Sequence, residues 1–126
     1  MNDCMKILVV DDNRTIKLLL EKKLSAEGFR VITASDGSEG LSTAAREMPD
    51  LILSDVDMPV MDGGEMVSKL KASAKTHHIP VIFLTSLVAK NENKRPATGE
   101  NWYLSKMAKP ADIVVAIRER LALLHK

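Results

Sequence analysis

A parallel β-sheet with helices on both faces is the architecture that the apolar pattern of this 126-residue chain indicates. Continuous apolar runs at residues 7–10, 51–53 and 81–84 are typical of strands that are covered on both sides. Between the runs, apolar residues recur at helical spacing. Strands that alternate with helices form a parallel sheet with right-handed crossovers. We therefore predict an α/β fold, and the length suits a single domain over residues 1–126.

Strands and helices can be placed along the chain. The predicted strands are residues 7–10, 29–34, 51–53, 81–84 and 102–104. The first helix precedes Gly28, which stands where glycine commonly ends a helix. The second begins at Asp36, where Glu39 completes the pattern of a capping box, and it ends at Pro49. We expect its inner face to carry Leu41, Ala44, Ala45 and Met48.

The second half of the chain contains one irregular stretch. Residues 90–100 read KNENKRPATGE and show neither the alternation of a strand nor the apolar spacing of a helix. A helix that begins near Leu87 should therefore be short or irregular. Fast amide exchange is expected across residues 90–98. The helices on either side are regular. Their expected apolar positions are Val67, Leu70 and Ala74 in the third, and Ile113, Val114, Ile117, Leu121 and Leu124 in the last.

Composition argues against several classes of protein. The chain has 18 Lys+Arg against 17 Asp+Glu and only 3% aromatic residues, unlike a dedicated nucleic-acid binder. No apolar run approaches the ~20 residues that span a bilayer, and the N-terminus has no signal-peptide pattern. The single Cys4 cannot form an internal disulfide, so we expect a reduced, cytoplasmic setting.

Polar side chains stand at the carboxyl ends of four predicted strands. They are Asp11 and Asp12 after the first strand, Asp55 and Asp57 at the third, Thr85 at the fourth, and Lys106 or Lys109 after the fifth. Because parallel strands end at one edge of the sheet, we expect these side chains to share a pocket. An acidic residue after a single strand is more often a helix N-cap, but four such strand ends favour a site.

The set suits phosphoryl chemistry. Clustered carboxylates repel one another unless a cation lies among them, and their hard oxygens suit Mg²⁺. An ionised Asp55 could attack phosphorus and carry an acyl phosphate. The Thr85 hydroxyl and a lysine ammonium would then neutralise the phosphoryl oxygens. The strand ends lack His and Cys, which argues against a hydrolytic triad or a structural zinc site.

Four motifs carry a resemblance to a known family. They are ILVVDD at residues 7–12, LILSDVDMPVMDG at 51–63, FLTS at 83–86 and YLSK at 103–106. With these motifs the chain resembles the receiver domains of two-component response regulators, in particular chemotaxis-type single-domain receivers. The resemblance implies a flavodoxin-like, doubly wound, five-stranded parallel sheet of order 2-1-3-4-5.

The resemblance also implies a role for each acidic residue. Asp55 would be the phosphoacceptor and Asp12 a Mg²⁺ ligand, with Asp11 assisting through water. The backbone carbonyl of Asp57 would complete the protein ligands. The side chain of Asp57 is a departure from the family, and we expect it either to alter phosphoryl lifetime and metal affinity or to be solvated at the pocket rim.

Thr85 and Lys106 would grip the phosphoryl group, and Tyr103 would change rotamer together with Thr85. Only Lys109 precedes a proline, as the family lysine usually does, but spacing from Tyr103 and from the final helix favours Lys106. The bond from Lys106 to Met107 should then be either a costly cis bond or part of a rearranged trans loop.

The implied function is a phosphorylation switch rather than an enzyme. A sensor histidine kinase or histidine phosphotransfer protein would phosphorylate Asp55 with Mg²⁺, and a downstream protein or fused output domain would read the change, with no contact to nucleic acid or membrane. A pseudo-receiver that only binds partners remains an alternative. A haloacid-dehalogenase-like phosphatase using Asp55 and Asp57 is another, and a flavin carrier lacks a phosphate-binding loop. Trp102 either covers the core or anchors a partner.

Overall fold

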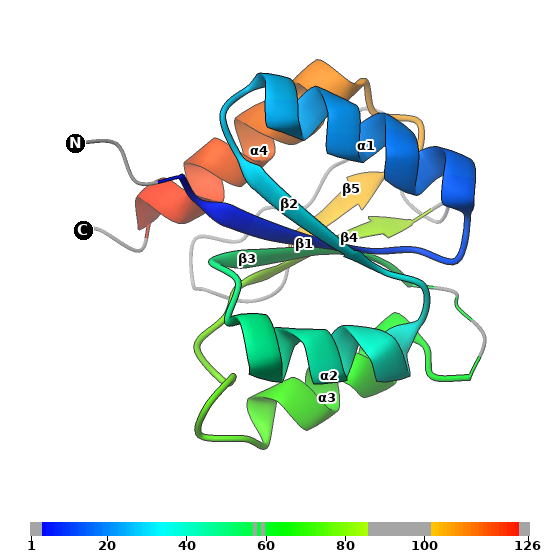
Figure 1. Ribbon diagram of the computed structural model, residues 1–126, viewed down its shortest axis with the longest axis vertical. Helices are drawn as coiled ribbons and strands as arrows, with labels where there is room; N and C mark the ends of the chain where they lie inside the picture. Colours follow the sequence, from blue (N-terminus) through cyan, green and yellow to red (C-terminus); the bar gives the residue numbers. More distant parts are fainter. Residues whose placement is uncertain (1–3, 57, 59, 86–101, 124–126) are drawn as a thin grey trace.

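The sheet lies between two layers of helices in the computed structural model, which describes residues 4–56, 58, 60–85 and 102–123 (Figure 1). Its strands are β1 (Lys6–Val10), β2 (Arg30–Ala34), β3 (Leu51–Asp55), β4 (Val81–Thr85) and β5 (Trp102–Ser105). They pair in parallel in the order β2-β1-β3-β4-β5. The predicted α/β fold and strand order are confirmed.

Each helical layer covers one side of the sheet. Helices α1 (Arg14–Ala26) and α4 (Pro110–Leu123) pack on one face, and α2 (Gly37–Glu47) and α3 (Gly63–Lys71) pack on the other (Figure 1). Successive strand residues alternate between the two cores, so that Ile7 and Val9 face the α1 side while Leu8 and Val10 face the α2 side. Burial on both faces explains the continuous apolar runs.

Three helices begin at the carboxyl edge of the sheet with a polar cap. Asn13, Asp36 and Asp62 each accept a hydrogen bond from a backbone N–H three residues later, at 2.8–3.0 Å. The predicted start at Asp36 is confirmed, although Glu39 accepts from the N–H of Ser35 at 2.6 Å rather than from that of Asp36. These caps fix the turns that lead away from the strand ends.

Two predicted inward positions are wrong. Met48 adopts a left-handed conformation with φ 49° and ends α2, which leaves its side chain 38% exposed. Ala74 is exposed beyond the end of α3, because Ser73 N–H and the Thr76 hydroxyl both donate to the carbonyl of Leu70 and stop the helix. Both errors lie at helix ends, where local hydrogen bonds outweigh periodicity.

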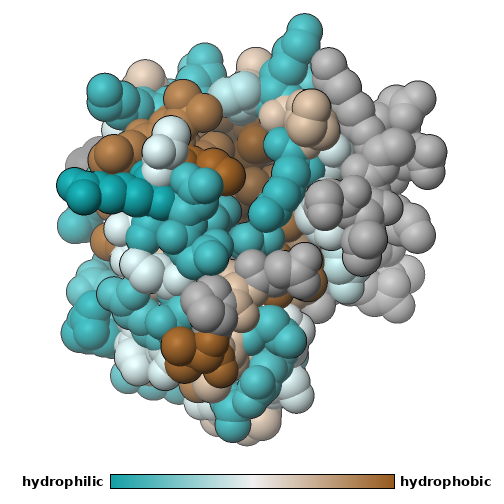
Figure 2. All heavy atoms as spheres, turned by 90° about the vertical axis from the view of Figure 1, so that its right-hand side faces the viewer, coloured by the Kyte–Doolittle hydropathy of each residue, from teal (hydrophilic) through white to brown (hydrophobic). Residues whose placement is uncertain are grey.

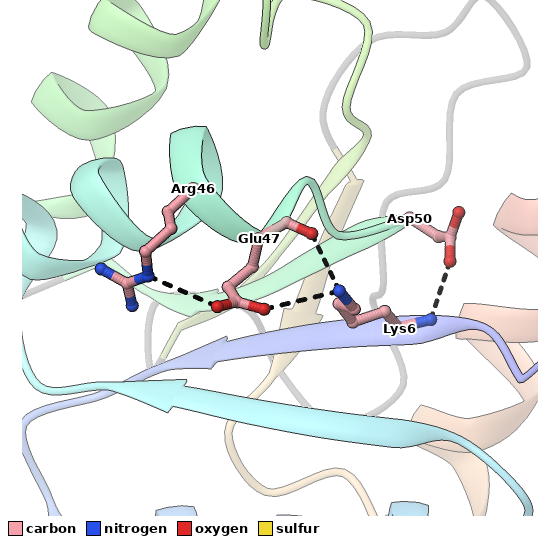
Figure 3. Close-up of polar contacts among 4 residues, drawn as sticks. All are labelled: Lys6, Arg46, Glu47 and Asp50. Atoms are coloured by element: carbon pink, nitrogen blue, oxygen red, sulfur yellow. Dashed lines mark hydrogen bonds and ion pairs between the residues drawn. The ribbon is translucent and has the colours of Figure 1, made fainter.

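At the amino ends of the strands, Lys6 makes several polar contacts (Figure 3). The Lys6 ammonium donates to the Glu47 carbonyl at 3.0 Å, and the Lys6 N–H donates to Asp50 at 2.7 Å. Arg46 lies 3.4 Å from the Glu47 carboxylate, and its contact is the largest cause that lowers the pKa of Glu47, followed by the charge of Lys6. These contacts join the start of β1 to the turn between α2 and β3, far from the strand ends that carry the candidate site.

Trp102 is 3% exposed and packs in the core with α4, which confirms its interpretation as a core residue. The expected irregular helix near Leu87, the exchange of residues 90–98 and the position of Leu124 lie outside the described residues. In the part of the chain that the structure describes, no helix is long and apolar enough to cross a membrane.

Candidate functional site

The carboxyl ends of the strands bring the predicted acidic residues together. One carboxylate oxygen each from Asp11, Asp12 and Asp55 can be chosen so that all three lie within 4.8 Å of one another. Asp11 and Asp55 are 2% and 3% exposed, whereas Asp12 is open to solvent. Figure 2 looks onto this edge, where hydrophilic side chains lie beside an apolar area. The result is an acidic cup with a buried floor and one exposed member.

Backbone geometry holds Asp11 in place. Its N–H donates to the Ala34 carbonyl at 3.0 Å, extending the β1–β2 pairing, and its Oδ1 accepts from the N–H of Asn13 at 2.8 Å. Burial raises the pKa of Asp11, and the nearby Asp55 charge adds to the rise against the opposing Asn13 hydrogen bond. A carboxylate in this position costs free energy when ionised, and a bound cation would offset that cost.

Among the residues that the structure describes, Lys106 forms an ion pair with Asp55. Its Nζ lies 2.9 Å from Asp55 Oδ1, an oxygen that is otherwise buried without a hydrogen-bond donor in the described structure. Burial alone would lower the pKa of Lys106, but the contact with Asp55 and the charges of Asp11 and Asp12 together raise it. The ammonium therefore remains charged and aimed at the carboxylate.

The turn after β5 presents this lysine. Lys106 N–H donates to the Thr85 carbonyl at 3.1 Å, and Met107 N–H donates to the Ser105 hydroxyl at 3.0 Å. None of the described peptide bonds is cis, so the turn takes the trans form of the two expected geometries. Lys109 instead lies at the start of α4, where its carbonyl accepts from the N–H groups of Asp112 and Ile113.

Thr85 and Tyr103 come from neighbouring strands beside the cup. Thr85 ends β4 and is 4% exposed, one residue beyond the position that pairs with Asp55. The Tyr103 ring stacks on Phe83, with centroids 5.3 Å apart, and keeps 36% of its surface exposed. Tyr103 is thus held by the Phe83 ring and remains partly exposed. The structure does not describe Asp57, the remaining predicted site residue.

The donor set fits Mg²⁺. Three carboxylates offer the hard oxygen ligands that this ion takes, and they leave room for water and substrate oxygens. Among the described residues, Lys106 Nζ is the one partner given for the buried oxygen Asp55 Oδ1, and a second cation would be favourable beside such a buried anionic oxygen.

The sequence reasoning missed two supporting residues. Asn13 both caps α1 and donates its N–H to Asp11, and Ser105 orders the turn that carries Lys106. Their signals were present, because Asn before a helix and Ser at a strand end commonly accept backbone hydrogen bonds. Neither residue carries charge, so neither stood out beside the acidic set.

Comparison with known proteins decides between the receiver and phosphatase interpretations. The sequence profile of the response regulator receiver domain matches residues 7–118. This chain belongs to the response regulator receiver family. Receivers are signalling domains of two-component systems rather than catalytic enzymes, which argues against the phosphatase alternative.

Several known proteins are similar to this chain in sequence or in structure. Response regulator PleD of Caulobacter vibrioides is 49% identical over 87 residues, covering 69% of this chain and 19% of PleD. The chain thus spans about a fifth of that relative. An uncharacterized 14.6 kDa protein of Leptolyngbya boryana is 38% identical over 91% of this chain and 88% of its own length. Chemotaxis response regulator CheY4 of Vibrio cholerae shares the fold with a TM-score of 0.82 and 32% identity, covering 94% of this chain and 99% of CheY4.

Proposed function

We propose that this receiver accepts a phosphoryl group on Asp55 from a phosphohistidine, in a Mg²⁺-dependent reaction. The observation that carries the proposal is the position of the Lys106 ammonium, 2.9 Å from one oxygen of a buried carboxylate that also belongs to a three-carboxylate cluster. A structural ion pair alone needs no acidic cluster around it. A phosphoryl-transfer site needs both positive charge and oxygen ligands.

The transfer exchanges one bond to phosphorus for another. The phosphorus–nitrogen bond of the donor's phosphohistidine breaks as a bond forms to a carboxylate oxygen of Asp55, and the released imidazole takes up a proton. Lys106 holds the carboxylate beforehand and then neutralises a phosphoryl oxygen. The Thr85 hydroxyl, on the adjacent strand end, donates to another phosphoryl oxygen.

Mg²⁺, when bound, supplies the positive charge that offsets the carboxylates and the phosphoryl oxygens. Asp12, Asp55 and the backbone carbonyl of Asp57 would hold it directly, with Asp11 acting through water. Because Asp12 is the exposed member of the cluster, it offers the ion a route from solvent.

The new charge at Asp55 would bias a two-state surface. Thr85 moves toward the phosphoryl group, and Tyr103 follows by changing rotamer from its stacked position on Phe83. A downstream protein, or an output domain fused to the receiver, reads the altered face. The donor is a sensor histidine kinase or a histidine phosphotransfer protein. We propose residues 1–126 as one receiver domain, and its cytoplasmic location stays a prediction.

Phosphoramidate, a small donor with a phosphorus–nitrogen bond, tests the proposal. Incubation with Mg²⁺ should add one phosphoryl group to the wild-type chain by intact mass, and EDTA or the Asp55→Asn substitution should abolish the addition. Equal labelling of wild type and Asp55→Asn would contradict the assignment. No labelling of wild type at any Mg²⁺ concentration would favour a pseudo-receiver that only binds partners.

A further inference from the structure

We propose that Gly37, the first residue of α2, is a positioning residue for the segment that follows Asp55, residues 56–62. We name this segment the acidic-site loop. The inference rests on the proposed function, because the carbonyl of Asp57 that would bind Mg²⁺ belongs to the same loop. It assigns to α2 a part in the site through a backbone N–H group of the helix.

A backbone contact links the helix to the loop. Gly37 N–H donates to the carbonyl of Met61 at 2.9 Å. A Cβ added to Gly37 would lie 2.3 Å from that same oxygen and 2.9 Å from the Met61 carbonyl carbon. Gly37 is buried, so neither group can retreat into solvent. Only glycine permits this approach of helix and loop.

The conformation of Val60 shows what the contact holds. Val60 has φ 68°, a left-handed conformation that is unfavourable for a β-branched residue, and its side chain is 83% exposed. Because the Val60 side chain buries so little surface, its packing does not offset the strain. Val60 directly precedes Met61, so the proposal assigns the left-handed turn at Val60 to the anchored carbonyl of Met61.

The other end of the loop is fixed independently. Gly63 N–H donates to the Val56 carbonyl at 2.9 Å, and a Cβ on Gly63 would lie 2.7 Å from the Asp55 carbonyl. The loop is therefore closed on itself at one point and attached to α2 at another. Loss of the Gly37 contact should leave the fold intact but free the Met61 carbonyl and the left-handed Val60 beside it.

Gly37→Ala tests the positioning role against a matched variant of the same helix. Gly40→Ala also introduces a clash, since its Cβ would lie 2.8 Å from Met66 Sδ and 3.1 Å from Val10 Cγ2, but it does not touch the loop. By isothermal titration calorimetry, Gly37→Ala should weaken Mg²⁺ binding about 10-fold, as loss of an outer support of a metal site typically does. Gly40→Ala should lower the thermal midpoint and leave Mg²⁺ affinity unchanged. Equal Mg²⁺ affinities for the two variants would overturn the proposal.

A double-mutant cycle tests the anchoring without Mg²⁺. Val60→Gly should raise the thermal midpoint of the wild type by about 4 °C through relief of strain, and should give no gain in the Gly37→Ala background. Met48→Gly relieves the other described non-glycine residue with positive φ and should give the same gain in both backgrounds. Equal Val60→Gly gains in both backgrounds would overturn the anchoring.

Hydrogen exchange in the wild type covers the case in which Gly37→Ala does not fold. The Gly37 amide should be protected without Mg²⁺ and further protected with it, and exchange at the unprotected rate would overturn the proposal. A wild-type chain that is protected at Gly37 but binds no Mg²⁺ and takes no phosphoryl group from phosphoramidate would refute the proposed function, while the protection of the Gly37 amide without Mg²⁺ would still support the anchoring.

Discussion

The contact between Lys106 and Asp55 is the residue-level feature with the clearest consequence. Lys106→Met removes the ammonium 2.9 Å from Asp55 Oδ1 and keeps much of the side-chain volume. We expect phosphoryl labelling by acetyl phosphate to slow about 100-fold, because a donor to the developing negative charge is lost. Intact mass spectrometry over time measures this rate. Lys109→Met is the matched control and should label as the wild type does, and two equal rates would contradict the choice of lysine.

Asp11 gives a second prediction, on pH. Burial is the largest cause that raises its pKa, so in the folded state Asp11 keeps its proton to a higher pH than in the unfolded state. Stability then falls as pH rises from the ordinary carboxyl value through the raised one. Asp11→Asn keeps the acceptor for Asn13 N–H and removes the charge, so without Mg²⁺ at pH 7 its thermal midpoint should exceed that of wild type.

The same substitution should weaken Mg²⁺ binding. Mg²⁺ affinity of the wild type should decline as pH falls through the raised pKa of Asp11, since ligands and their supports act when deprotonated. In Asp11→Asn this part of the pH dependence should disappear. Calorimetric titrations at several pH values check it. The account would be contradicted if Asp11→Asn were less stable than wild type without Mg²⁺ and bound Mg²⁺ with unchanged affinity. The ionised Asp11 carboxylate would then neither destabilise the empty site nor contribute to Mg²⁺ binding.

At the scale of elements, the start of α3 must pass very close to β3. A Cβ on Gly63 would lie 2.7 Å from the Asp55 carbonyl and 2.8 Å from the Phe83 ring, whereas one on Gly64 would meet nothing nearer than 3.5 Å. Gly63→Ala should cost about 1–3 kcal/mol of unfolding free energy. Gly64→Ala, next along the same helix, should gain up to about 1 kcal/mol. Urea unfolding measures both, and similar values for the pair would contradict the close packing.

The elements themselves were largely predictable. Burial on both faces makes β1, β3 and β4 continuous apolar runs, and caps such as Asp36 mark where helices begin. Helix ends were less predictable. Met48 falls on the apolar spacing of α2, yet the chain leaves the helix there in a left-handed turn that no neighbouring glycine signals.

At the scale of the whole molecule, parallel topology made the convergence of the acidic residues predictable. Four strand ends meet at one edge, so the polar residues that follow them had to converge, and Asp11, Asp12 and Asp55 do. The contact between Gly37 and Met61 could not be predicted in the same way. The hydrogen bond joins backbone groups of two segments that are distant in the sequence, so no side chain identifies it. Its one trace in the sequence is a glycine, and glycine occurs at many kinds of position.

Mg²⁺ should stabilise the entire fold if it binds the acidic cup. A ligand that binds only the native state adds about 2.7 kcal/mol at 100 times its dissociation constant. The thermal midpoint of wild type should therefore climb with Mg²⁺ concentration, and that of Asp12→Asn should climb less. Differential scanning calorimetry in choline chloride of matched ionic strength separates binding from salt screening. Identical curves in the two salts would exclude specific binding.

The most direct measurement identifies the phosphorylated residue itself. After incubation with acetyl phosphate and Mg²⁺, borohydride reduction converts an aspartyl phosphate to homoserine, which peptide mass spectrometry can locate. The account predicts homoserine at position 55 and at no other aspartate. Homoserine at Asp11 or Asp12, or an unmodified Asp55 in a chain that has gained a phosphoryl group, would contradict it.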